Sequence, residues 1–268
     1  MWGDIVIAFL LAFMTAFVLT PYTIRLAKKV GAIDLPNDER RVNKKPMPRL
    51  GGIAVISGFI LSSIYLIIIM NIDKNVFYSG IGTYTVKLIG FFIGIIVLGI
   101  GCFIDDVKGI PSFVKLIVQI IAAIIVVASG IRIANINIPF FDNKIGLNNT
   151  LSYIITVFWI VGITNAINLI DGLDGLSSGI TLISCISLLI IFTLNGSPII
   201  AIVLITALAG AILGFLPYNF NPAKTFIGDT GSNFLGFSLA IISILRFGKN
   251  IYSNSFDSTY YSTCFTNI

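Results

Sequence analysis

The chain has 268 residues, of which 56% are hydrophobic and 11% are charged. Soluble domains carry about 25% charged residues, so this composition leaves too little polar surface and excludes a water-soluble protein. The formal net charge of +5 does not by itself identify a partner, because its meaning depends on where the basic residues lie along the chain. We expect the partners of a membrane protein and no nucleic acid.

Apolar stretches follow one another along the chain, and most approach the roughly 17–25 residues that cross a bilayer core as a helix. We predict transmembrane helices at 5–26, 51–70, 87–104, 113–129, 151–164, 178–194, 198–217 and 232–245. The sequence therefore predicts an all-α polytopic membrane protein with about eight transmembrane helices. Residues 1–246 then form a single integral membrane domain.

The loop after the first predicted helix is strongly basic. Its cationic residues are Arg25, Lys28, Lys29, Arg40, Arg41, Lys44, Lys45 and Arg49. Basic loops favour the cytoplasmic side, which places the N-terminus outside and the loops 105–111, 165–177 and 218–231 inside. In an outer loop, the segment 131–144 alternates like a pair of strands and contains turn signals.

Five aspartates from three of these loops converge on the predicted cytoplasmic face. Asp105 and Asp106 are adjacent, so one of their pKa values should rise unless a cation neutralises the pair. The alternative is two solvated loop acids. Lys115 and Gln119 lie four residues apart on one face of the next helix, where Lys115 is well placed to hold an anion.

Two glycine-rich segments carry the other three aspartates. Asp171 and Asp174 in "NLIDGLDG" are spaced to present both carboxylates on one side of a helical turn, although an ordinary glycine-rich turn is the alternative. Asp229 stands in "GDTGS" at the start of the eighth span. Amides at a helix N-terminus suit phosphate, and a carboxylate suits Mg²⁺.

Acids for a metal, bases for phosphates and an apolar flank for a lipid thus meet at one membrane face. This combination indicates metal-assisted phosphoryl transfer between a cytoplasmic nucleotide and a lipid phosphate. A transporter is less favoured, because the sequence shows no inverted repeat and no pair of broken spans.

Four ordered motifs between residues 34 and 236 resemble the polyprenyl-phosphate N-acetylhexosamine-1-phosphate transferases, glycosyltransferase family 4. They are "RRVNKKPMPRLGG", "DDVKGIPSFVKLIVQ", "NAINLIDGLDGLSSG" and "NPAKTFIGDTGS". The spacing from the acidic pair to Lys115 and the "PMPRLGG" stretch resemble the UDP-N-acetylglucosamine branch. They resemble less the branch that transfers phospho-MurNAc-pentapeptide in peptidoglycan synthesis, which stays the alternative.

The resemblance implies ten or eleven transmembrane helices in the complete family fold and an active site at the cytoplasmic side of the bacterial plasma membrane. It also implies that a UDP-sugar and undecaprenyl phosphate yield undecaprenyl-diphospho-sugar and UMP with Mg²⁺, or alternatively Mn²⁺. The product would begin a cell-wall polymer, such as a teichoic acid linkage, or a surface polysaccharide. A homodimer is a further expectation from the family.

By the same resemblance, each motif residue has an expected role. Asp229 would ligate Mg²⁺, and Asp105 would deprotonate or position the lipid phosphate with Asp106 beside it. Asp171 and Asp174 would shape the nucleotide site together with Asn168. The residues expected to hold phosphates, sugar and uracil are Lys44, Lys115, Asn219 and, by stacking, Phe226.

The chain departs from the family pattern in two respects. It has no histidine, whereas the family usually has one where this chain has Asn43 and a His-rich loop after a ninth span. The sequence also stops soon after the eighth predicted span, so we expect a C-terminally truncated transferase domain. We interpret the polar residues 247–268 as a frameshift product. The alternative is a genuine tail on an inactive, shortened membrane protein of the same ancestry.

Overall fold

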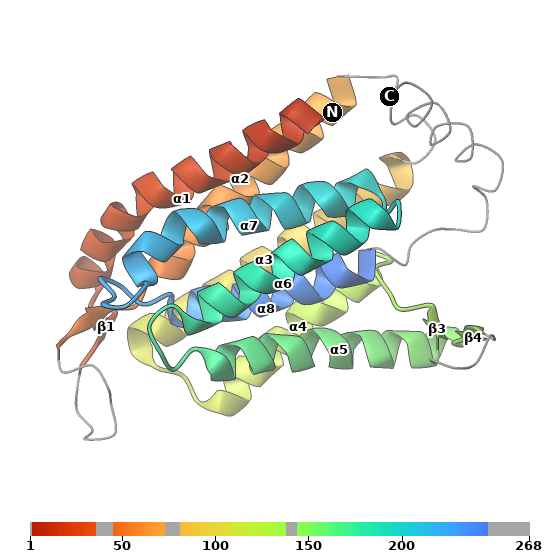
Figure 1. The fold of residues 1–268 in the computed structure, drawn as a ribbon. Helices are drawn as coiled ribbons and strands as arrows, with labels where there is room; N and C mark the ends of the chain where they lie inside the picture. Colours follow the sequence, from red (N-terminus) through yellow and green to blue (C-terminus); the bar gives the residue numbers. More distant parts are fainter. Residues whose placement is uncertain (1, 36–44, 73–80, 138–143, 246–268) are drawn as a thin grey trace.

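The computed structural model describes residues 2–35, 45–72, 81–137 and 144–245. The helices within them are α1 (Trp2–Val30), α2 (Gly51–Ile72), α3 (Ile81–Lys108), α4 (Ser112–Ala128), α5 (Asn149–Ile170), α6 (Leu176–Leu194), α7 (Ile199–Asn219) and α8 (Gly228–Leu245). Figure 1 shows them side by side as one bundle, with α1, α2 and α7 along one edge and α4 and α5 along the other.

Each predicted span coincides with one of these helices, so the all-α polytopic fold is confirmed. Within the described residues, α1, α2, α3, α5, α6 and α7 are long and apolar enough to cross a membrane. The other two are shorter: α4 has 17 residues, and α8 has 18 and begins with a polar turn. The chain is therefore a multi-pass membrane protein.

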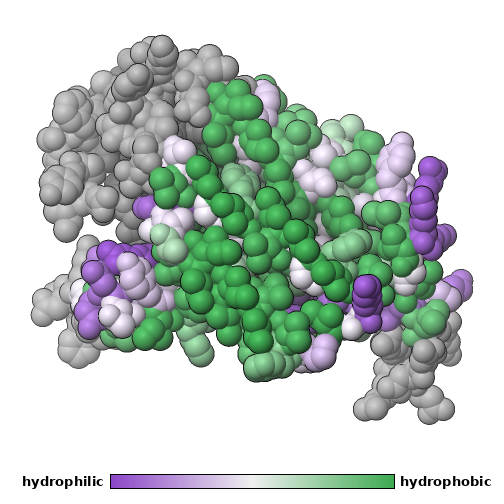
Figure 2. Space-filling model, turned by 180° about the vertical axis from the view of Figure 1, so that it is seen from behind, coloured by the Kyte–Doolittle hydropathy of each residue, from purple (hydrophilic) through white to green (hydrophobic). Residues whose placement is uncertain are grey.

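The outer surface of the bundle is apolar over most of its length. Figure 2 shows a nearly continuous hydrophobic face, with hydrophilic side chains gathered toward its two ends. Large apolar side chains point outward from several helices, including Phe158, Ile183 and Ile190. A contiguous exposed apolar surface of this kind is suited to lipid and not to water.

The centre of the bundle is formed by α7 and α8, whose side chains are buried almost throughout. Small residues bring α1 close to α7: Ala12 is fully buried, and a Cβ added at Gly210 or Gly214 would meet the backbone oxygen of Phe9 or Phe13. Small residues at such crossings allow close backbone packing between membrane helices.

Two short hairpins lie outside the helices. Strand β1 (Ile33–Asp34) pairs antiparallel with β2 (Met47–Pro48), and β3 (Asn135–Asn137) pairs antiparallel with β4 (Lys144–Gly146). The second hairpin confirms that a strand pair forms here, but its second strand begins only at Lys144, the last residue of the predicted segment 131–144. The first was not predicted, because strands of two residues are too short to show an alternating pattern.

Helices extend farther into the predicted loops than the hydropathy pattern indicates, which corrects the expected loop boundaries. Residues that consequently lie in helical turns and not in loops are Asp105, Asp106, Asn165, Asn168 and Asp229. A polar residue ends an apolar run without ending the backbone hydrogen bonds. Helix α3 continues to Lys108 and is followed by Gly109, whose φ of 67° is typical of a helix C-terminus.

Candidate active site at one end of the bundle

The Asp106 carboxylate caps the N-terminus of α8. Its Oδ1 accepts a hydrogen bond from the backbone N–H of Asp229 at 2.9 Å, and its Oδ2 accepts from the Thr230 N–H at 2.8 Å and from Thr230 Oγ1 at 2.6 Å. The turn at the start of α8 requires glycine at position 228. Gly228 has a φ of 72°, and a Cβ there would collide with the Arg49 carbonyl. Asp106 thus binds the end of α3 to the start of α8, and its side chain is fully buried.

Two cations hold the carboxylate of Asp229, in the first turn of α8. The Lys115 Nζ donates to Oδ1 at 3.0 Å, and an Arg49 guanidinium nitrogen donates to Oδ2 at 3.0 Å. The same Lys115 Nζ lies 2.5 Å from Oδ2 of Asp105. The structure therefore brings Asp105, Lys115 and Asp229 together as the sequence predicts, and it adds Arg49.

The donor atoms at this place fit Mg²⁺. Asp105 Oδ1 accepts a hydrogen bond from the Ile110 N–H, whereas its buried Oδ2 has no hydrogen-bond partner of good geometry. That oxygen and Asp229 Oδ1 both face the Lys115 ammonium. Two carboxylates suit Mg²⁺, which takes its other ligands from water and phosphate. The described residues contain no group of three or more acidic, His or Cys side chains arranged to hold a metal.

A buried layer of amide side chains lies beneath the charged groups. Gln119, one helical turn after Lys115, donates to Asn233 Oδ1 at 2.7 Å and accepts from Asn165 Nδ2 at 2.6 Å. Asn233 in turn donates to the backbone oxygen of Asp229 at 2.8 Å. These bonds join α4, α5 and α8, and they fix the turn that carries Asp229.

The two aspartates of the glycine-rich segment face different partners. Asp171 ends α5 and accepts a hydrogen bond from Ser177 Oγ at 2.6 Å. Burial raises the pKa of the Asp171 carboxyl to about 7, the Ser177 hydroxyl opposes that rise, and the negative charges of Asp229 and Asp106 add to it. Asp171 therefore belongs electrostatically to the same site as the acids of α3 and α8.

Asp174 instead binds the segment between α7 and α8. Its Oδ2 accepts from Asn221 Nδ2 at 3.2 Å and from the backbone N–H of Ala223 at 3.1 Å. Asn168, in the last turn of α5, accepts from Ser232 Oγ of α8 at 2.7 Å. The residues predicted on the nucleotide side therefore connect the end of α5 and the segment after it to α8 and to the segment between α7 and α8.

The remaining predicted residues support the fold at this end of the bundle or lie outside the described residues. Asn219 is buried, accepts from Ser178 Oγ at 2.8 Å and donates to the Thr225 backbone oxygen at 3.1 Å, so its amide is engaged within the protein. Phe226 is half-buried in the segment leading to α8. Lys44 falls among residues 36–44, which the structure does not describe.

Sequence reasoning missed part of the site. The residues that it did not assign to the site are Arg49, Asn165, Thr230, Ser232 and Asn233. One local signal was present for Asn233, because it stands four residues after Asp229, as Gln119 stands four after Lys115. Polar side chains repeated at this spacing within an apolar helix indicate a buried, partnered face.

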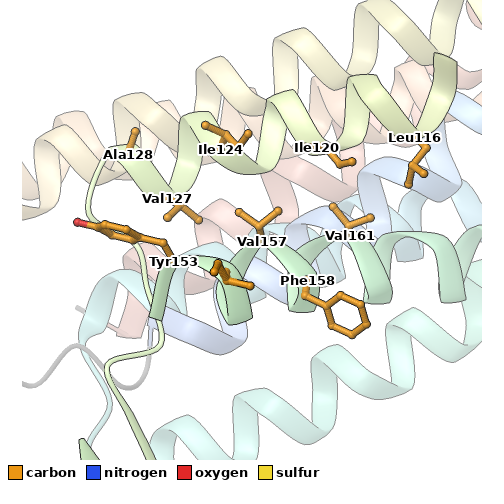
Figure 3. Close-up of a pocket in the computed structure, with 10 residues that line it drawn as sticks. Leu116, Ile120, Ile124, Val127, Ala128, Tyr153, Val157, Phe158 and Val161 are labelled. Atoms are coloured by element: carbon orange, nitrogen blue, oxygen red, sulfur yellow. The ribbon is translucent and has the colours of Figure 1, made fainter. Parts of the chain in front are cut away.

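An apolar groove of about 810 Å³ leads away from the charged groups along the outer face of α4 and α5. Figure 3 shows its lining side chains, with Leu116 at one end of α4 and Ala128 and Tyr153 at the other. Leu116 directly follows Lys115 in the chain. The groove therefore runs along the lipid-facing side of the bundle, and its lining on α4 begins one residue after Lys115.

The chain matches the family model "Glycosyl transferase family 4" over residues 88–246. It is 41% identical to a probable undecaprenyl-phosphate N-acetylglucosaminyl 1-phosphate transferase of Bacillus subtilis, over 92% of this chain and 64% of that protein. It is 35% identical to a phospho-N-acetylmuramoyl-pentapeptide-transferase of Staphylococcus epidermidis, over 90% of this chain and 74% of the relative. A decaprenyl-phosphate N-acetylglucosaminephosphotransferase of Mycobacterium tuberculosis is 34% identical over 88% of this chain and 59% of its own length.

The chain thus spans about two thirds of the length of these relatives, and slightly less in two of the three cases. The matched region contains the acidic pair, Lys115, the glycine-rich segment and the start of α8. The family match, covering more than half of the chain, and these identities establish that the protein belongs to glycosyl transferase family 4.

Proposed function

We propose that this site transfers a sugar-1-phosphate, N-acetylglucosamine-1-phosphate, from a UDP-sugar to undecaprenyl phosphate. The products are undecaprenyl-diphospho-sugar and UMP. The observation that carries the proposal is the pair of carboxylates, Asp105 and Asp229, held around the ammonium of Lys115, with an apolar groove whose lining on the same helix begins at the next residue. The printed name of the Bacillus subtilis relative supports the choice of sugar and lipid.

The groove suits the polyprenyl chain of the acceptor. The α4 residues that line the groove run from Leu116 to Ala128, so the groove is about 18 Å long, more than half the roughly 30 Å thickness of a bilayer core. Its lining side chains come from α4 and α5 and are almost entirely apolar. A chain lying there would place its phosphate near Lys115, where an ammonium group can pair with it.

In the reaction, an oxygen of the lipid phosphate forms a bond to the phosphorus that bears the sugar, and the bond from that phosphorus to UMP breaks. Asp105 would position the lipid phosphate or accept its proton, and Lys115 would neutralise phosphate charge. Mg²⁺ held by Asp229 would supply further charge neutralisation on the diphosphate. Asp171, Asp174 and Asn168 would shape the nucleotide side, and Phe226 would stack on uracil.

We place the site at the cytoplasmic face of a bacterial plasma membrane. The basic residues Lys28 and Lys29 end α1 beside this end of the bundle, as the positive-inside rule requires for a cytoplasmic loop. UDP-sugars are cytoplasmic, so this orientation gives the donor direct access. The product would begin a wall polymer or a surface polysaccharide.

A second candidate is transfer of phospho-MurNAc-pentapeptide, favoured by the Staphylococcus epidermidis relative, of which the chain covers 74%. The test supplies membranes containing the full chain with undecaprenyl phosphate and either UDP-N-acetylglucosamine or UDP-MurNAc-pentapeptide. Lipid products are then separated and identified by mass. A product from the first donor alone supports the proposal, whereas a product from the pentapeptide donor alone replaces it. No lipid product from either donor, with correctly inserted protein, contradicts both.

A further inference from the structure

The ammonium group of Lys115 occupies the position that a divalent cation would need. Its Nζ lies 2.5 Å from Asp105 Oδ2 and 3.0 Å from Asp229 Oδ1, so one cation contacts both carboxylates. The three side chains are only 7–19% exposed, so water screens this interaction weakly. One position between two carboxylates cannot hold an ammonium and a metal ion together.

Arg49, the other cation on Asp229, is held differently. It reaches Asp229 Oδ2, whereas Lys115 holds Oδ1, and it also approaches Asp106 and Asp34 at 3.7 and 4.0 Å. Its backbone N–H donates to Ala32 at 3.1 Å. Arg49 is therefore anchored by three acids and by the main chain, whereas the four-carbon stem of Lys115 allows its ammonium to move.

We propose that Lys115 is a resident counter-ion that competes with the divalent cation for Asp105 and Asp229. The inference rests on the proposed function for the presence of that ion. When the ion binds, the Lys115 ammonium leaves the two carboxylates and becomes available to a phosphate at the mouth of the groove that begins at Leu116. Metal binding and phosphate binding then favour each other. Metal binding releases the ammonium that the phosphate pairs with, and phosphate binding releases the two carboxylates that the metal needs.

The test measures Mg²⁺ binding to the purified full chain in detergent without substrate, as the rise in its thermal unfolding midpoint during a Mg²⁺ titration. In Lys115→Met the competing charge is absent. One neighbouring unit charge changes the proton affinity of a carboxylate by roughly 1–3 pKa units, so Mg²⁺ affinity should rise by about tenfold or more. Arg49→Met is the matched control, and it should raise Mg²⁺ affinity less than Lys115→Met does.

A second measurement uses the wild-type protein and does not depend on the folding of a variant. Amine acylation of Lys115, followed by mass spectrometry, should become several-fold faster when Mg²⁺ is added. The exposed Lys108 provides the internal control, and its rate should stay constant. Acylation of Lys115 that is unchanged or slower in Mg²⁺ overturns the proposal.

The variants separate failure of this inference from failure of the proposed function. Mg²⁺ stabilisation that disappears in Asp229→Asn, but is equal or weaker in Lys115→Met than in wild type, overturns the competition and leaves the metal assignment intact. An equal rise in Mg²⁺ affinity in Arg49→Met and Lys115→Met also overturns the competition. The rise would then follow from the loss of any nearby positive charge and not from the position of Lys115. No Mg²⁺ stabilisation in wild type overturns both the metal assignment and the competition.

Discussion

Replacement of Asp106 tests whether its carboxylate holds the end of α3 to the start of α8. The carboxylate accepts three hydrogen bonds, from the N–H groups of Asp229 and Thr230 and from the Thr230 hydroxyl. In Asp106→Ala, two buried N–H groups lose their acceptor. At about 1–3 kcal/mol for each unsatisfied donor, the free energy of unfolding should fall by roughly 2–6 kcal/mol.

Two milder variants should give smaller, ordered losses. Asp106→Asn keeps one acceptor oxygen and loses about one hydrogen bond to a charged group, so we expect a loss of roughly 1.5–3 kcal/mol. Thr230→Val removes only the hydroxyl donor and should cost about 0.5–1.5 kcal/mol. The assay is denaturant unfolding of the purified chain in detergent micelles, read from the loss of helical signal at equilibrium.

The control is Asp4→Asn, the same chemical change as Asp106→Asn in the first turn of α1, at the end of that helix remote from the site. It should lower the unfolding midpoint less than Asp106→Asn does. If Asp106→Ala unfolds at the wild-type midpoint, or if Thr230→Val is as costly as Asp106→Ala, the capping argument is refuted. Asp106 would then have to act on substrate and not on the fold.

Four further predictions concern other parts of the bundle. The folded-state pKa of Asp171 is raised to about 7, so ionisation of this carboxyl lowers the free energy of unfolding as pH rises from about 4 to 7. Asp171→Asn lacks the ionisable group and should therefore be more stable than wild type between pH 5 and 8. Removal of the hydroxyl donor in Ser177→Ala should raise the pKa of Asp171 further, which a pH series of unfolding midpoints would detect. Gln119→Leu removes the donor to the buried Asn233 Oδ1 and one of the two acceptors of Asn165 Nδ2, so it should lower the free energy of unfolding by roughly 1–3 kcal/mol. A Cβ at Gly214 would meet the Phe13 backbone oxygen, so Gly214→Ala should destabilise by about 1–3 kcal/mol in the same assay; wild-type stability would contradict the close crossing.

Much of the fold is readable from the sequence because hydropathy reports directly on membrane helices. The existence of each helix follows from an apolar run, and a strand pair near 131–144 follows from alternation and turn residues, although its second strand lies at 144–146. The helix ends are less readable. Asp105 and Asn165 are polar and end their apolar runs, yet the backbone hydrogen bonds of α3 and α5 continue through them.

The candidate site was predictable as a set of acids and one lysine, but not as a network. Arg49 and Asp229 are separated by 180 positions and Gln119 and Asn233 by 114, so no local pattern could pair them. The roles of Asp106 and Asp174 as anchors also depend on backbone N–H groups of distant segments. Those contacts exist only once the helices have packed.

The most direct test of the central claim is the Mg²⁺-dependent exchange of radiolabelled UMP into UDP-N-acetylglucosamine, in membranes that contain the full chain and undecaprenyl phosphate. The exchange requires the bond between UMP and the sugar-bearing phosphate to break and re-form. The account predicts exchange in wild type and in Asp4→Asn and none in Asp229→Asn. Exchange that persists in Asp229→Asn, or its absence from wild-type membranes that bind Mg²⁺, would contradict the account.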